Sequence, residues 1–204
     1  MAEHSSMHGY LNWAKERIDE MDAALASLEA KAGQIKAEAK PKSDELIAEL
    51  KKRRDEFQAT VNKQAEAGQA AWEQTRKQLE PQWSGFEAQV KTYFETVSKQ
   101  IEQQQATFRD VAAAQMKAWR EAVDKVIPGA AAEFAADSRA DIDAAVKQMK
   151  VDAAAAEARL QKLRQSGTES WAVLSAALAE SRKAFDRANQ AAWDALKRAA
   201  PPHA

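Results

Sequence analysis

Few breaks interrupt a chain whose residues otherwise favour continuous helix. They fall at single prolines, at one Ser-Gly pair and at a Pro-Pro pair near the C-terminus, namely Pro41, Pro81, Pro128, Ser166-Gly167 and Pro201-Pro202. Proline lacks a backbone N–H and clashes with the preceding turn, so each one is expected to start, end or kink a helix. These breaks predict five helices, at about 9–39, 43–79, 82–126, 130–165 and 169–199.

Apolar residues recur at helical spacing inside these segments. In the first, Leu11, Ala14, Ile18, Met21 and Leu25 alternate steps of three and four residues, which is a heptad seam. The third segment carries a stripe with steps of three, four and four, an average of about 3.67 residues per turn. The stripe consists of Trp83, Phe86, Val90, Phe94, Val97, Ile101, Gln105, Phe108, Ala112, Met116, Trp119, Val123 and Ile127. One apolar face on each helix indicates helices that must pack on another element.

Composition supports the same architecture. Ala and the straight-chain residues Gln, Glu, Lys and Arg lose little rotamer freedom in a helix, and the chain has only 6 Gly and 5 Pro. At about 1.5 Å per residue the predicted helices are roughly 45–68 Å long. We expect an all-α fold, an elongated antiparallel bundle of four to five long amphipathic helices with coiled-coil-like packing, whose core dimerisation could complete. Residues 9–200 would form this single domain, between flexible tails at 1–8 and 201–204.

Two features of the sequence carry a resemblance to known families. The eleven-residue period covers roughly residues 70–127, and Pro81 opens one block of it. In this it resembles the helical repeats of exchangeable apolipoproteins. There is also a hint of internal repetition, because Gln69-Ala70-Ala71-Trp72-Glu73 is echoed by Gln190-Ala191-Ala192-Trp193-Asp194. The Ala- and Gln-rich, Cys-free helical chain is similar to phasins, which coat bacterial polyester granules. Both resemblances imply amphipathic helices that cover a lipid or polymer surface.

The sequence lacks the patterns of common active sites. It contains no Cys, and its three histidines, His4, His8 and His203, lie in the terminal segments. It has no G-x-S-x-G elbow, phosphate loop or dinucleotide fingerprint, and no Glu-x-x-His pattern of di-iron bundles. We therefore expect a protein that is not an enzyme, with no catalytic, cofactor-binding or metal-binding residues and no cofactor. One metal alternative stays open. After removal of Met1, Ala2-Glu3-His4 offers an amine, backbone amides and an imidazole that suit Cu(II) or Ni(II), although a disordered tail is the favoured interpretation.

Charge argues against a nucleic-acid partner. Lys and Arg together number 30 and Asp and Glu 31, so no strong field attracts phosphates. The densest basic run, Lys51-Lys52-Arg53-Arg54, is flanked by Glu45, Glu49, Asp55 and Glu56. Helical neighbours three and four residues away can neutralise it, so we expect an ion-paired helix surface. Because neither a signal peptide nor an apolar run of about 20 residues is present, we expect a cytoplasmic location.

Six tryptophans are many for so polar a chain. Trp83 and Trp119 lie on the stripe of the third segment, which predicts core positions. The remaining tryptophans are predicted for interaction, because a ring with a polar N–H suits a partly exposed interface, and Phe185 is included as a member of the apolar stripe that begins at Trp171. The candidates are Trp13, Trp72, Trp171, Trp193 and Phe185. The predicted function is that of a non-enzymatic structural or interaction protein, which binds itself as a homo-oligomer or another protein through helix surfaces. The alternative is a coat whose helices leave the bundle and lie on a lipid or polymer-granule surface.

Overall fold

The computed structural model describes residues 2–67, 72–98, 100–132, 139–167 and 169–199 of the 204-residue chain. This part is helical apart from short turns, contains no strand, and so confirms the all-α prediction. A π-helical turn, η2 (Ala122–Val126), and the short helix α5 (Ile127–Ala131) continue the fourth long helix. The six long helices are α1 (Ala2–Ala32), α2 (Lys40–Ala67), α3 (Trp72–Thr96), α4 (Ile101–Glu121), α6 (Ala140–Ser166) and α7 (Trp171–Ala199).

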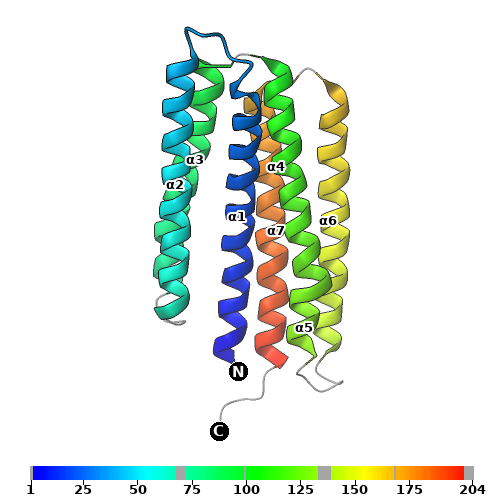
Figure 1. Cartoon of the computed structure of the whole chain (residues 1–204). Helices are drawn as coiled ribbons and strands as arrows, with labels where there is room; N and C mark the ends of the chain where they lie inside the picture. Colours follow the sequence, from blue (N-terminus) through cyan, green and yellow to red (C-terminus); the bar gives the residue numbers. More distant parts are fainter. Residues whose placement is uncertain (1, 68–71, 99, 133–138, 168, 200–204) are drawn as a thin grey trace.

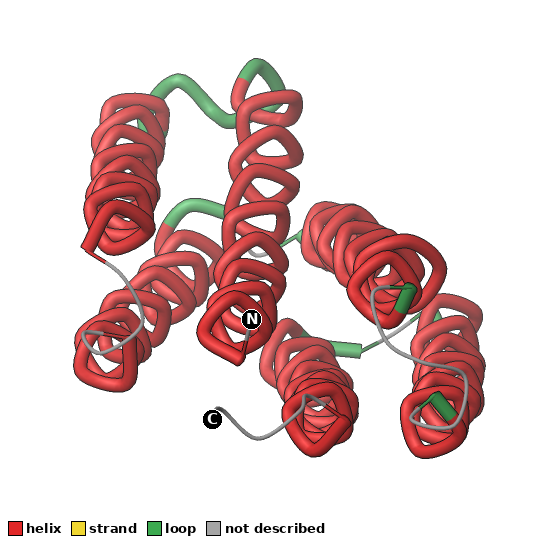
Figure 2. Tube along the Cα trace, turned by 90° about the horizontal axis from the view of Figure 1, so that it is seen from below, coloured by secondary structure: helices red, strands yellow, loops and turns green. Residues whose placement is uncertain are grey.

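The long helices lie side by side with their axes in roughly one direction (Figure 1). Seen along these axes, α1 lies between two groups, with α2 and α3 on one side and α4, α6 and α7 on the other (Figure 2). Helix α1 packs most extensively on α4 and also contacts α2, α3 and α7, whereas α3 touches α7 over only a short stretch. α6 packs mainly on α7. Helix α1 is therefore the central element that joins the two groups.

The prediction of a single helix at 82–126 is wrong, because the structure divides this segment between α3 and α4. Pro81 lies inside α3, and the chain turns after Thr96 instead. The backbone N–H groups of Val97 and Ser98 both donate to the carbonyl of Tyr93, at 2.8 and 3.3 Å, which closes the last turn of α3. The apolar spacing continues across this turn, so periodicity alone could not locate it. As a result Ile101, a member of the predicted stripe, is 45% exposed.

Other helix ends follow known rules for prolines and glycines. α2 begins at Lys40, so Pro41 lies in its first turn, where the missing N–H is not needed. α6 ends at Ser166, within the predicted Ser166-Gly167 break and one residue past the predicted end at 165, since Gly167 has φ 72°, a left-handed conformation that favours glycine. α1 begins at Ala2, within the segment predicted as a tail. The predicted tail at 201–204 lies outside the described residues.

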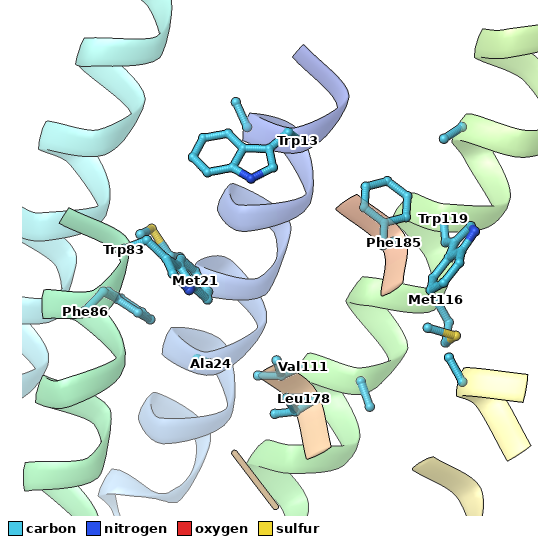
Figure 3. Packing of buried hydrophobic residues seen from close by; sticks show 14 of the residues in the cluster. Trp13, Met21, Ala24, Trp83, Phe86, Val111, Met116, Trp119, Leu178 and Phe185 are labelled. Atoms are coloured by element: carbon cyan, nitrogen blue, oxygen red, sulfur yellow. The ribbon is translucent and has the colours of Figure 1, made fainter. Parts of the chain in front are cut away.

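One continuous apolar core runs between the helices. Trp83 and Trp119 are only 7% and 1% exposed, which confirms their predicted core positions. The Trp119 ring meets Phe185 of α7 edge-on, with centroids 5.2 Å apart. Figure 3 shows this pair on one side of α1 and, on the other side, Trp83 and Phe86 of α3 beside Met21. The core therefore depends on contacts between helices that are distant in sequence.

Candidate interaction surface

The aromatic residues predicted for interaction lie mostly in the core. The exposed fractions are 5% for Trp13, 8% for Trp171, 2% for Trp193 and 1% for Phe185. Trp72 is the first residue of α3, and its side chain lies outside the described part of the structure. In this conformation the four buried rings offer almost no surface to an external partner.

Each of these buried rings packs on a neighbour within the chain. The ring centroid of Trp13 is 6.2 Å from that of Phe57 on α2, and the centroid of Trp171 is 4.8 Å from that of Phe94 on α3. Trp13 packs on α2, Trp171 on α3 and Phe185 on α4, so these rings have different neighbours. A partner could reach them only if the helices separated.

Charged side chains are also buried where α1, α3 and α7 meet. Arg182 of α7 donates from Nη2 to Oε2 of Glu20 on α1, at 2.7 Å, and from Nε to Oε1 of the same carboxylate, at 3.1 Å. Its Nη1 lies 3.1 Å from Oε1 of Glu87 on α3. The Arg182 side chain is 8% exposed and the Glu20 side chain 0%. One guanidinium thus connects three helices inside the protein.

A second buried guanidinium lies next to the first. Arg17 of α1 pairs with the adjacent Glu16 and donates from Nη2 to Oδ2 of Asp186 on α7, at 2.7 Å. Its guanidinium carbon lies 4.9 Å from the ring centroid of Trp13, a cation–π contact. We call the whole group the buried ion cluster, which consists of Glu16, Arg17, Glu20, Glu87, Arg182 and Asp186.

Burial dominates the electrostatics of the buried ion cluster. Loss of hydration raises the pKa of Glu16 well above its usual value, although the nearby Arg17 acts in the opposite direction. Burial likewise raises the pKa of Glu87, which Arg182 partly offsets. Burial alone would lower the pKa of Arg182, but the carboxylate of Glu20 outweighs it and raises that pKa above its usual range. The cluster is therefore a structural anchor for α7, with each guanidinium paired to carboxylates.

Sequence reasoning missed the buried ion cluster, although the chain contains a signal for it. The apolar stripe of the last helix passes through Leu174 and Leu178 and then skips to Phe185. Ser181 and Arg182 occupy the skipped positions, so they face the same side as the stripe. A charged residue on an apolar face indicates a buried pair, but the sequence does not show which carboxylate pairs with it.

A surface depression lies between α6 and α7, and we call it the α6–α7 groove. Its volume is about 720 Å³. Small and apolar side chains, buried or half-buried except for Ala155, line its floor, and charged side chains line its rim. The floor consists of Ala155, Ala156, Leu160, Leu163, Ala177, Ser181 and Ala184, and the rim includes Asp152, Arg159, Lys162, Glu180 and Arg187.

The two carboxylates of this rim already have partners. Glu180 pairs with Lys183 at 3.0 Å, and Asp152 accepts a hydrogen bond from Gln148 at 3.0 Å. The hydrogen bond from Lys183, with the nearby positive charges, lowers the pKa of Glu180. In contrast, none of the rim cations, Arg159, Lys162 and Arg187, forms an ion pair with another described residue. The groove therefore combines an apolar floor with three rim cations that form no ion pair with a described residue, two of which also act on Glu180.

Comparison with protein-family models, with curated proteins and with solved structures gives no match. The function is therefore inferred from the chain's own residues.

A second depression, of about 300 Å³, lies between α3 and α7. Trp83, Phe86 and Trp171 line it, together with Arg182 and Glu87 of the buried ion cluster. This depression lies where α3 and α7 touch over only a short stretch.

The basic run in α2 is largely ion-paired, as expected. Two of its members pair with α1, Lys51 with Glu29 and Arg54 with Asp22, and the N···O distances are 2.5 and 2.7 Å. The prediction named only acidic residues that flank the run in sequence. Neighbours from a second helix therefore use much of the charge that could otherwise bind phosphate.

No group of three potential metal ligands occurs among the residues whose side chains are described. The N-terminal alternative, Ala2-Glu3-His4, has its side chains outside that part, and so does His203. Within the described ranges, no helix is both long enough and apolar enough to cross a bilayer.

Proposed function

We propose that this chain is a non-enzymatic, cytoplasmic structural or interaction protein that binds another protein, or a second copy of itself, through helix surfaces. The α6–α7 groove is the observation that supports this most directly. It has an apolar floor bordered by Arg159, Lys162 and Arg187, none of which forms an ion pair within 4 Å with a described residue, although Arg159 and Arg187 lie near enough to Glu180 to lower its pKa. A groove between two helices is a common receptor for a third helix. Binding there requires no change in the packed core.

The same proposal includes an elongated antiparallel bundle with coiled-coil-like packing. Short connections between successive long helices support it, such as the turn at 33–39 between α1 and α2. Long parallel faces of this kind leave grooves along the outside of a bundle, and the α6–α7 groove is one of them. The architecture thus supplies surfaces for binding without any loop-based site.

A coat for lipid or polymer surfaces is the second candidate, and one specific observation favours it. The buried ion cluster lies where α3 touches α7 over only a short stretch. Ions taken out of water carry a desolvation cost of several kcal/mol each, which they would recover on exposure. Separation of α3 from α7 would also expose Trp83 and Trp171, which could then contact an apolar surface.

Among the side chains that the structure describes, the closed bundle presents no continuous apolar face of the kind that lipid requires. Among the described residues, the exposed large apolar side chains are Ile101, Val151 and Val173, on three different helices. A lipid-binding face needs a continuous apolar stripe. The coat therefore requires opening, whereas the α6–α7 groove is accessible as it stands, and we favour protein binding for this reason.

A titration with vesicles separates the two candidates. The intact protein is mixed with neutral vesicles, anionic vesicles and polystyrene particles while Trp emission and circular dichroism are recorded. We expect no saturable change in any of them. Saturable binding with a blue shift of the Trp emission would contradict protein binding as the main function and favour the coat.

The positive test uses a photo-crosslinking amino acid at position Ala177 in the groove. In native cell extract we expect a protein adduct of one defined mass, either with a partner or with a second copy. The control carries the same crosslinker at Lys147, which is exposed on α6 outside the groove. Equal crosslinking at both positions, or none at Ala177, would count against binding through this surface.

A further inference from the structure

We propose that the α6–α7 groove receives an acidic amphipathic helix of a partner protein. This inference rests on the proposed function and names the chemistry of the partner. Three properties of the groove lead to it, namely its length, the sign of its unused charge and one unpaired hydroxyl on its floor.

The dimensions of the groove suit a helix of moderate length. Its lining on α6 extends from Asp152 to Ser166, which at 1.5 Å per residue corresponds to about 21 Å, or roughly four helical turns. The floor is rich in alanine, with Ala156 buried and Ala177 and Ala184 half-buried, so no large side chain of the floor projects from these positions. Small side chains allow helix axes to approach to about 8 Å, the lower end of the usual range. A third helix can therefore lie along the groove, over α6 and α7.

The charge of the rim selects acidic residues on the partner. Arg159 and Lys162 of α6 face Arg187 of α7 across the groove, and none of the three is in an ion pair with a described residue. The rim carboxylate Glu180 is already paired with Lys183. A helix with Glu or Asp on both flanks of its apolar stripe would form ion pairs with these rim cations, whereas a basic helix would be repelled.

A buried hydroxyl on the groove floor provides an independent indication. Ser181 is only 7% exposed, and its Oγ has no hydrogen-bond partner among the described residues. The exposed fraction of a second serine of α7, Ser175, is larger, yet its hydroxyl donates to the Ala172 carbonyl at 3.2 Å. A buried polar atom without a partner costs free energy, which a polar side chain of the partner would recover once the Ser181 hydroxyl rotates toward the groove. We therefore expect a polar residue near the middle of the partner helix.

A designed peptide tests the inference on the full-length protein. The probe is a dye-labelled, acetylated 18-residue helix with an Ala/Leu stripe, a central Gln on the stripe and Glu on both flanks. Two further peptides carry Lys on the flanks, or the acidic sequence in scrambled order. We expect saturable fluorescence anisotropy for the acidic helix only, with affinity at least about ten-fold above that of the Lys peptide.

Matched variants then locate the binding. Arg159→Glu with Arg187→Glu should weaken binding of the acidic peptide by about ten-fold or more, because like charges then face each other. Lys147→Glu with Arg198→Glu makes the same charge change on the same two helices outside the groove, and should alter affinity by less than about two-fold. Ser181→Ala should weaken the Gln peptide about three-fold and leave a peptide with Leu at that position unchanged. Circular dichroism confirms that each variant is folded.

Several outcomes would overturn the inference. They are absence of saturable binding by the acidic helix, equal binding of the Lys peptide, and an equal loss of affinity in the Lys147/Arg198 control. If the acidic helix does not bind but the crosslinker at Ala177 still captures a defined protein, the inference about an acidic helix fails while the proposed function stands. If instead only vesicles bind, both fail together.

Discussion

Helix α7 uses its charged residues differently on two faces. On the face toward α1 and α3, Arg182 and Asp186 pair with buried or half-buried groups of the same chain. On the face toward α6, Arg187 stands exposed on the rim of the α6–α7 groove without a described ion pair. The buried charges fix how the helices pack, whereas the exposed ones are available to another molecule. Burial, more than residue type, therefore separates structural charge from candidate binding charge in this helix.

The two faces should also differ in their contribution to stability. Removal of one partner from a buried pair leaves an uncompensated charge and typically costs about 3–5 kcal/mol. Removal of an exposed charge usually changes stability by less than about 1 kcal/mol. Four predictions test this contrast. The first gives the loss of stability expected for an apolar core residue, with which the others are compared.

The largest loss is expected for Trp119→Ala. The ring is 1% exposed and contacts Phe185 edge-on, so its removal leaves a large cavity between α4 and α7. The free energy of unfolding should fall by about 3–5 kcal/mol in urea titrations. The control is Val173→Ala on the exposed surface of α7, where Val173 is 45% exposed and the loss should stay below about 0.5 kcal/mol. Comparable losses at both positions would mean that Trp119 is not packed as described.

A loss of about 3 kcal/mol, the lower end of the buried-pair range, is expected for Arg182→Ala. This change leaves Glu20 buried without its main partner, although Gln115 still donates to it at 3.0 Å. The half-exposed Glu87 can regain water, which moderates the loss. Lys183→Ala, one residue away on the exposed surface, should cost less than about 0.5 kcal/mol.

The double replacement of Glu20 and Arg182 by Leu sharpens this test. Apolar replacement of a buried ion pair is often neutral or stabilising, so the double variant should regain most of the stability that Arg182→Ala loses. Failure to regain it would show that the buried ion cluster contributes more than the sum of its paired charges, through Gln115 and Glu87.

The sequence predicts much of the fold and little of the candidate site. Apolar spacing and helix breaks predict the all-α fold and the break at Ser166-Gly167 that ends α6, because both depend on local chemistry. They miss the turn after Thr96, since the stripe continues through it and the reversal depends on packing between distant helices. The α6–α7 groove could not be foreseen, because Arg159 and Arg187 are adjacent only once the helices pair. Burial of the rings at Trp13 and Trp193 likewise depends on helices that are far apart in sequence.

The third prediction concerns pH and addresses the buried ion cluster alone. Burial raises the pKa of Glu16 in the folded state above its usual value of 4.5, which applies to the unfolded state. At a pH between the unfolded-state and folded-state pKa values, the folded protein therefore binds this proton more tightly. Stability contributed by this group therefore rises as pH falls toward 4.5 and is constant below it. We expect the free energy of unfolding to increase when the pH is lowered from 7 to about 5.

Glu16→Gln should remove most of this increase, because the amide does not titrate. Glu45→Gln, a matched change at an exposed carboxylate, should retain it. At lower pH the trend should reverse, since the ion pairs of Glu121 and Glu180 lower the pKa of those carboxyls and are lost when they are protonated. A stability that falls steadily from pH 7 to 5 in the unmodified protein would contradict the prediction.

The smallest effect on stability is expected on the other face of α7, for Arg187→Glu. Because the side chain is exposed and has no described ion pair, the free energy of unfolding should change by less than about 0.5 kcal/mol. The same substitution should lower the affinity for the acidic peptide in the binding assay. Replacement of Arg187 should therefore change peptide affinity and not stability, whereas replacement of Arg182 should change stability and not peptide affinity. Urea titration and peptide anisotropy on both single variants measure this directly. If Arg187→Glu destabilised the fold as strongly as Arg182→Ala, Arg187 would belong to the structural charges, and the distinction between the two faces of α7 would be lost.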